Sequence, residues 1–199
     1  MVNTKKLKDV EIELKLINEL QKNNEQSQRS ISKELNVALG LANSLIKRFV
    51  RKGFLKLSEA PMKRYIYYLT PKGLLEKTKL TSEYIKSSLK SFQNIKLEYE
   101  NEFENISDQK NYKLVLVGVS ELTEIAILAA NISNLKISYI YDESSPLHSM
   151  CGIKVKKRVT VNKNNILVLT ESNNIYKVLK KIKKINCKRL IIPDFLKVN

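Results

Sequence analysis

The longest unbroken pattern in the sequence is helical, and it runs from Gly73 to about Ile106 without an internal glycine or proline. At about 1.5 Å per residue, a helix of this length reaches about 50 Å, which is more than one small domain can cover. A chain of 199 residues with such a helix near its middle is expected to carry a small domain on each side. We expect a first domain at 1–73, the helix and a linker at 74–107, and a second domain at 108–199.

This segment carries a stripe of apolar and small residues at close to the 3.5-residue spacing of a coiled coil. The stripe consists of Leu74, Thr78, Thr81, Ile85, Ser88, Phe92, Ile95, Tyr99 and Ile106. Such helices usually dimerise, so we predict a homodimer. A single spacer helix that packs its stripe on the chain's own domains is the alternative.

Two short helices joined by a tight turn are predicted before the long helix, after a first amphipathic helix at 8–22. Ser27 can cap the first of the two, and Gly53 ends the second, which covers 38–52. The second helix has an apolar side and an opposite polar, basic side that carries Asn43, Ser44, Lys47, Arg48 and Arg51. This arrangement is typical of a helix-turn-helix.

A hairpin is predicted next, from strands at 54–58 and 64–70 around the loop 59–63. Thr70 and Pro71 then open the long helix, as cap and first helical residue. Between residues 47 and 64 there are seven basic residues and one acidic residue, Glu59. The basic residues lie where a winged helix would meet a DNA duplex.

These segments resemble a known family. The runs "SQRSISKELNVALGLANSLIKRFVRKGFLK" and "YIYYLTPKGLLEKTKLTSEYI" are similar to winged-helix regulators of the MarR class, above all its exopolysaccharide-associated subgroup. The likeness covers residues 10–100. Ala38 departs from the family, which usually has Ser or Thr at the start of the recognition helix. The resemblance implies a transcription regulator that binds double-stranded DNA, with polysaccharide or cell-surface genes as candidate targets.

The recognition helix is expected to enter the major groove. The residues expected nearest the bases are Leu39, Gly40, Asn43, Ser44 and Lys47. Four further residues are expected to hold phosphates or to reach the minor groove: Arg48, Arg51, Lys63 and Arg64. The expected DNA-binding set also includes Ser27, Gln28 and Arg29, at the start of the preceding helix.

The second half has a different pattern. Four short apolar runs, of the kind buried in parallel sheets, lie within 112–119, 136–143, 164–171 and 188–195. Helical patterns at 120–133 and 172–187 separate the first pair and the last pair, whereas 144–161 reads as a loop with a short extended piece. The predicted fold is therefore an α+β winged helix-turn-helix, a long helix, and a small α/β Rossmann-like domain with a parallel sheet.

The second half resembles the nucleotide-binding N-terminal domains of sugar-modifying enzymes in polysaccharide synthesis, and related CoA-binding-like Rossmann domains. The resemblance rests on Gly118, Asp142 and the segment "CGIKV". It implies a nucleotide-type ligand.

The dinucleotide fingerprint is incomplete, because Ser120 and Thr123 stand where the second and third glycines are expected. Ser120 can donate to a phosphate or cap the helix, whereas Glu121 would repel a phosphate. Asp142 follows Gly118 by 24 residues, about where an acid that binds ribose is expected.

Two interpretations stay open for the second half. One is a pocket for a nucleotide or nucleotide-sugar effector, formed by Gly118, Ser120, Glu121 and Asp142. The other is an interaction domain with no ligand. The basic run "KVKKR" at 154–158 either supplies the phosphate charge or forms a solvated edge.

Composition restricts the function classes. The net charge of +16 favours nucleic acid as a partner. Part of this charge is explained by the many lysine codons that AT-rich genomes contain. We find no catalytic constellation around His148 and no metal spacing at Cys151 or Cys187. Without a membrane span or a signal-peptide core, we expect a cytoplasmic protein that is not an enzyme. A protein-binding scaffold and an enzyme acting on a nucleotide-linked substrate are the rival classes.

Overall fold

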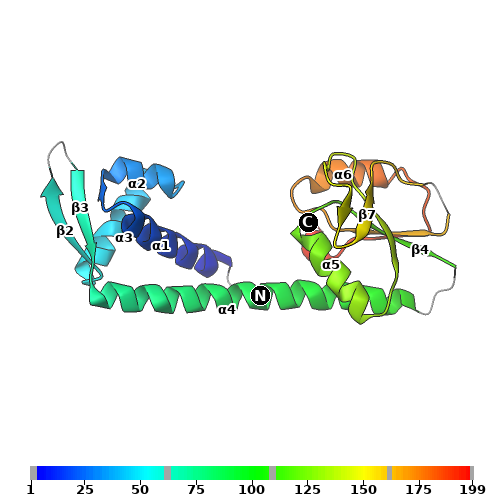
Figure 1. Ribbon diagram of the computed structural model, residues 1–199, viewed down its shortest axis with the longest axis horizontal. Helices are drawn as coiled ribbons and strands as arrows, with labels where there is room; N and C mark the ends of the chain where they lie inside the picture. The colour runs from blue at the N-terminus through cyan, green and yellow to red at the C-terminus, as the bar shows by residue number, and fades with distance from the viewer. Residues whose placement is uncertain (1–3, 61–63, 108–110, 161–162, 198–199) are drawn as a thin grey trace. The chain divides into compact units, whose positions relative to one another are not determined.

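The computed structural model describes residues 4–60, 64–107, 111–160 and 163–197 (Figure 1). The chain divides into two compact units, Met1–Ser91 and Phe92–Asn199. Helix α4, Pro71–Ser107, contributes its first part to the N-terminal unit and its last part to the C-terminal unit. The segment 74–107 predicted as a separate element is thus divided between them.

The N-terminal unit combines helices with a small antiparallel sheet. Its elements before α4 are α1 (Thr4–Lys22), β1 (Glu25–Gln26), α2 (Gln28–Glu34), α3 (Leu39–Arg51), β2 (Leu55–Ala60) and β3 (Arg64–Leu69). The strand order is β1-β3-β2. The core packs apolar residues of α1, α2 and α3 against the hairpin, with Ile17, Ile31, Phe49 and Tyr67 among those wholly or almost wholly buried. The predicted helix-turn-helix and hairpin are both present.

The ends of α2 and α3 follow from local sequence. The Ser27 hydroxyl accepts a 3.1 Å bond from the amide of Ser30, so Ser27 caps α2. Ala38 precedes α3 without a side-chain cap. Gly53 has a φ of 74°, and the amides of Gly53 and Phe54 bond back to the carbonyls of Val50 and Phe49. This pair of bonds is a Schellman motif, and it confirms Gly53 as the residue that ends the recognition helix.

Helix α4 begins against the end of α3. The Thr70 hydroxyl accepts a 3.0 Å bond from the amide of Gly73 and donates a 2.7 Å bond to the carbonyl of Gly53. A Cβ at Gly73 would overlap the Phe54 carbonyl oxygen and lie 3.0 Å from its carbon. The predicted Thr-Pro helix start is therefore confirmed, and Gly73 is required by a close backbone approach.

The C-terminal unit is an α/β domain with a six-stranded sheet. After α4 its elements are β4 (Lys113–Val117), α5 (Glu121–Ile132), β5 (Ile137–Tyr141), β6 (Ser149–Met150), β7 (Ile153–Lys156), β8 (Asn165–Leu169), α6 (Ile175–Ile182), β9 (Arg189–Ile191) and the 3-10 helix η1 (Asp194–Leu196). The strand order is β6-β7-β5-β4-β8-β9, and all neighbours are parallel except β6 and β7. The predicted Rossmann-like fold is confirmed, with α6 shorter than the predicted 172–187.

Helices cover both faces of this sheet (Figure 1). Leu114 and Leu116 of β4 face α5 and the last part of α4, whereas Val115 and Val117 face α6 and η1. Because both faces are covered, β4 and β8 are apolar without alternation, as is usual for parallel strands.

The predicted stripe on α4 has two environments. Tyr99 and Ile106 are fully buried in the core of the C-terminal unit, together with Phe103. Leu74 and Ile85 are instead 53% and 50% exposed. The last part of the stripe thus packs on the chain's own domain, as in the spacer alternative, and the part before it leaves an uncovered apolar face.

Candidate nucleic-acid interface and ligand cavity

The outer face of α3 gathers six of the twelve residues predicted to contact DNA. Ala42, Leu45, Ile46 and Phe49 turn inward and are buried. On the opposite side, a surface depression is lined by Gly40, Asn43, Ser44, Lys47, Arg48 and Arg51. The structure therefore brings these six predicted residues onto one polar, basic surface.

Exposed apolar side chains lie at the start of α3. Leu39 is 40% exposed and Leu41 is 46% exposed. Leu39 was predicted to lie near the bases, whereas Leu41 was missed, because its spacing did not match the polar face. Apolar side chains at this end of a recognition helix are suited to the methyl group of thymine.

Asn43 carries an unusual polar atom. Its Oδ1 is buried and accepts no hydrogen bond within the part of the chain that the structure describes. A buried oxygen without a donor is unfavourable. Rotation of the side chain would bring the amide to this surface, where its oxygen can accept and its nitrogen can donate a hydrogen bond.

Arg48 already has a partner. Its Nη2 forms an ion pair with Oε1 of Glu13 on α1. A guanidinium has five N–H donors, so the pair leaves others for a phosphate. Sequence reasoning missed Glu13, because the approach of α1 to α3 is a tertiary contact.

The other predicted DNA-binding residues have different surroundings. Ser27 uses its hydroxyl as the α2 cap, Gln28 is half-buried and Arg29 is exposed. Lys63 lies outside the described residues. Arg64 begins β3 opposite Ala60, and its side chain is likewise not described.

In the C-terminal unit, the turn after β4 requires glycine for a reason internal to the protein. Gly118 has a φ of 103°. A Cβ there would lie 2.7 Å from Cβ and 2.8 Å from Cα of Glu171. The close approach that fixes Gly118 is thus to a neighbouring strand end, and it needs no ligand.

The remaining fingerprint positions bond to each other. Ser120 Oγ donates a 2.6 Å bond to the Thr170 carbonyl and accepts a 3.1 Å bond from the amide of Leu122. Thr123 Oγ1 accepts a 3.0 Å bond from the amide of Ser120 and completes a capping box. Of the two roles predicted for Ser120, helix capping is the one in the structure.

Asp142 closes the same turn from the end of β5. Its Oδ2 accepts a 2.9 Å bond from the amide of Val119, and its Oδ1 accepts bonds from the Ser144 amide and hydroxyl and from the Ser145 amide. Burial raises the pKa of this carboxyl, but these hydrogen bonds outweigh the burial and hold the pKa below its usual value. Oδ1 accepts three of these bonds and Oδ2 accepts one, so Asp142 acts first as an internal anion.

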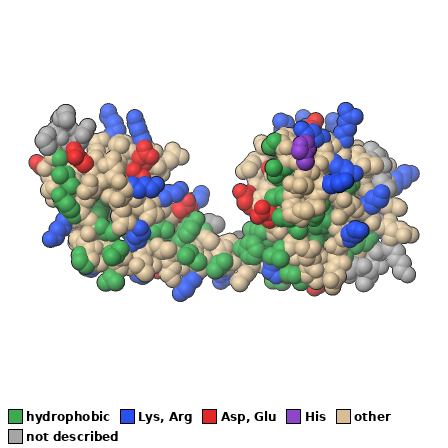
Figure 2. All heavy atoms as spheres, in the orientation of Figure 1, with side chains coloured by type: hydrophobic (Ala, Val, Ile, Leu, Met, Phe, Trp, Pro, Cys, Tyr) green, Lys and Arg blue, Asp and Glu red, His purple; other side chains and the backbone are tan. Residues whose placement is uncertain are grey.

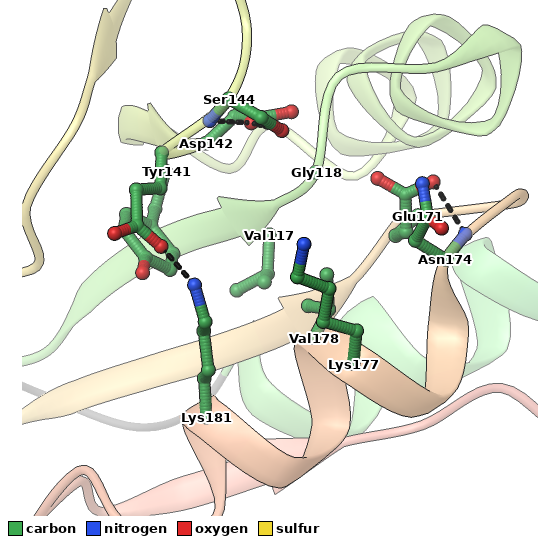
Figure 3. A pocket seen from close by; sticks show the side chains of 11 residues that line it. Val117, Gly118, Tyr141, Asp142, Ser144, Glu171, Asn174, Lys177, Val178 and Lys181 are labelled. Carbon is green, nitrogen blue, oxygen red and sulfur yellow. Dashed lines mark hydrogen bonds and ion pairs between the residues drawn. The ribbon is translucent and has the colours of Figure 1, made fainter.

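A cavity of ≈ 310 Å³ lies beside this turn (Figure 3). It is lined by Val117, Gly118, Tyr141, Asp142, Glu143, Ser144, Glu171, Asn174, Lys177, Val178 and Lys181. Parallel α/β sheets bind ligands at this place, outside the carboxyl ends of strands where the chain order reverses. Of the four residues predicted for a ligand pocket, Gly118 and Asp142 line this cavity, whereas Ser120 and Glu121 are not among its lining residues.

The cations of the cavity come from α6 and were missed. Lys177 reaches toward its centre, and Lys181 forms an ion pair with Glu143 (Figure 3). A hydrogen bond and the positive charge of Lys181 lower the pKa of Glu143. The i, i+4 spacing of Lys177 and Lys181 indicated a shared face, but not which strands that face meets. The basic run 154–158 contributes no lining residue.

The described residues form neither a candidate metal site nor a membrane-spanning helix. Within them no group of three or more His, Cys, Asp or Glu side chains is placed to hold a metal ion. Cys151 and Cys187 are free thiols. None of the described helices has the length and apolar character needed to span a membrane.

Comparison with known proteins supports the N-terminal assignment. Residues 10–56 match the family described as winged helix-turn-helix DNA-binding. No curated protein matches the chain. Among solved structures the chain is similar to "PigF with SAH", at 14% identity and a TM-score of 0.26, over 83% of this chain and 63% of that one. Residues 10–56 thus form a winged helix-turn-helix DNA-binding domain.

Proposed function

We propose that the protein is a transcription regulator that reads double-stranded DNA through α3. The observation that carries the proposal is the polar, basic face of α3, where Asn43 and Lys47 line one depression and the Asn43 amide oxygen has no donor among the described residues. An asparagine can bond adenine bidentately and a lysine can bond guanine in the major groove. Arg51 and the free donors of Arg48 hold phosphates, which fix the position of the helix on the duplex.

The regulator acts as a homodimer in this proposal. Support comes from the uncovered apolar side chains Leu74, Leu75, Ile85, Leu89 and Phe92 on α4. Apolar residues this exposed on one helix favour a partner, and a second copy presents the same face. Two copies carry two recognition helices, so the operator has two related half-sites.

The C-terminal unit senses a small effector in the cavity beside Gly118. The cavity lies at the low end of the roughly 300–1,000 Å³ range of ligand pockets, so a nucleotide or the head group of a nucleotide sugar suits it better than a dinucleotide. The amides of Gly118, Val119 and Ser120 are already bonded within the protein. We therefore expect Lys177 to bind the phosphate of the effector. We assign no catalytic step to the cavity. Polysaccharide or cell-surface genes are the proposed targets, and the cytoplasm is the proposed location.

The test is selection of duplexes from a random library by the full chain, with the oligomeric state measured by sedimentation. The expected result is an enriched, imperfect palindrome bound by a dimer. Lys47→Ala should weaken binding to that sequence, whereas Lys22→Ala, which removes an exposed lysine at the end of α1, should not. A scaffold that binds protein would enrich no sequence, and an enriched single half-site bound by a monomer would reject the dimer alone.

A further inference from the structure

The second half of the chain contains a basic segment that the winged helix does not explain. Between Glu171 and Asp194 there are seven basic residues and no acidic residue. The seven are Lys177, Lys180, Lys181, Lys183, Lys184, Lys188 and Arg189. All are exposed, and they belong to α6 and the chain that follows it. Figure 2 shows Lys and Arg side chains spread over the C-terminal unit.

Helix α6 separates its apolar side from its basic side. Val178, Leu179 and Ile182 pack on the sheet. Lys180 is exposed on the other side, and Tyr176 is 76% exposed. Because its apolar side is already covered, α6 offers a partner charge and a phenol hydroxyl, not an apolar surface.

Ion pairs account for two of the seven cations. Lys181 pairs with Glu143, which lines the cavity, and Arg189 pairs with Glu102 of α4 at 3.1 Å. Lys177 reaches into the cavity (Figure 3). The remaining four define the α6 basic surface: Lys180, Lys183, Lys184 and Lys188.

Stability of α6 explains this surface only in part. Lysines in the last turn suit the partial negative charge of the helix C-terminus, which accounts for Lys180 and Lys183. Lys184 follows the C-cap residue Lys183 and makes no charge pair within the helix. Lys188 lies beyond α6, where no helix end benefits from it. A negatively charged partner therefore explains the four lysines of the α6 basic surface better than helix stability does.

We propose that the α6 basic surface is a second DNA contact, which binds the phosphate backbone of duplex DNA without regard to sequence. Flexible lysines with no base-reading geometry bind phosphates as point charges. The Tyr176 hydroxyl adds a donor of a kind that commonly contacts phosphate. The inference rests on the proposed function in taking DNA as the partner.

The test compares two full-length variants that each lose four positive charges. One carries Lys180→Gln, Lys183→Gln, Lys184→Gln and Lys188→Gln. The matched control carries Lys136→Gln, Lys154→Gln, Lys157→Gln and Arg158→Gln, at exposed positions elsewhere on the same unit. Binding to a random-sequence duplex is measured across salt concentrations, after thermal melting has shown that both variants are folded.

Each lost phosphate contact lowers the steepness of log K against log salt by about 0.9. The α6 variant should therefore lose about two to four units of slope, and at least about tenfold in affinity at low salt, whereas the control should lose less than one unit. Equal losses in both variants would show an effect of net charge alone. An unchanged slope in the α6 variant would show that these lysines contact only solvent. Tighter binding to single-stranded RNA than to the duplex would show that RNA is the partner. Each of these results overturns the proposal.

Failure of this inference is distinguishable from failure of the proposed function. The α6 variant should keep the sequence preference of the wild type, because it leaves α3 intact. If the protein prefers a sequence but the α6 variant keeps the wild-type slope of log K against log salt, the second contact is rejected and the proposed function stands. If the salt dependence of binding falls in the α6 variant but the wild type shows no sequence preference, the second contact stands and the proposed function is rejected.

Discussion

The hydroxyl of Tyr99, on α4, donates a buried 3.0 Å hydrogen bond to the carbonyl of Leu169, the last residue of β8. The two residues after Leu169 are Thr170, which holds Ser120, and Glu171, which lines the cavity. The same helix begins at Thr70, bonded to the end of the recognition helix. Helix α4 is thus anchored in each unit at a residue next to that unit's candidate site.

Removing the Tyr99 hydroxyl should destabilise the protein. Burial raises the pKa of Tyr99, so the phenol stays a donor at neutral pH. Tyr99→Phe keeps the ring that stacks on Phe103 and leaves the Leu169 carbonyl without this donor. We expect a loss of about 1–2 kcal/mol in the free energy of unfolding, measured in urea. Tyr176→Phe is the control, since Tyr176 is exposed, and equal stability of the two variants would contradict the role of the bond.

Alanine should have opposite effects at two glycines. Gly73→Ala places a Cβ against the Phe54 carbonyl, and the backbone must shift, at a cost of about 1–3 kcal/mol. Gly40, inside α3, has no heavy atom within 4 Å of the added Cβ, so Gly40→Ala should gain up to about 1 kcal/mol from helix propensity. Melting temperatures check both, and the same sign for the two changes would refute the packing at Gly73.

Asp142 should make stability depend on pH in the acid range. Its folded pKa lies below the ordinary value of 3.8, so the carboxylate stabilises the fold above that value, and the contribution is lost as the pH falls through the folded pKa. Asp142→Asn cannot titrate. The stability difference between wild type and variant should therefore be full at pH 6 and shrink below pH 3.8. Urea unfolding across this range measures it, and a constant difference would argue against the lowered pKa.

The cavity should bind small phosphorylated ligands through Lys177. UMP or UDP-glucose at a hundredfold excess over its dissociation constant should stabilise the fold by about 2.7 kcal/mol, visible as a melting shift. NAD should give little shift, because the loop amides are already used. Lys177→Ala should reduce the shift and Lys180→Ala should not. Gly118→Val is unsuitable for this purpose, since its side chain would strike Glu171. Absence of a shift with every nucleotide at millimolar concentration would leave an interaction domain without a ligand.

Features set by neighbouring residues were predictable from the sequence. Gly53 ends α3 because a left-handed residue closes a Schellman motif, and Thr70 with Pro71 starts α4 through local capping. The apolar runs of the parallel sheet were also predictable, because strands that are buried on both faces lack alternating polar residues.

Features set by distant contacts were not predictable. The two-residue strand β1 exists because Glu25 and Gln26 pair with β3, and two residues carry no pattern of their own. Lys177 and Lys181 enter the cavity because the crossover places α6 beside β5 and β8. The sequence showed that the glycine fingerprint was incomplete, but the spacing could not reveal that Ser120 and Asp142 bond the loop internally.

Base readout by Asn43 is the most direct test of the account. Each base pair of the selected operator is replaced in turn, and binding is measured for the wild type and for Asn43→Ala. The wild type should lose about 1–3 kcal/mol at the base pair that Asn43 contacts in each half-site. The variant should lose nothing further there, while keeping its discrimination at other positions. If Asn43→Ala discriminates at every position as strongly as the wild type, α3 does not read the operator in the way proposed here.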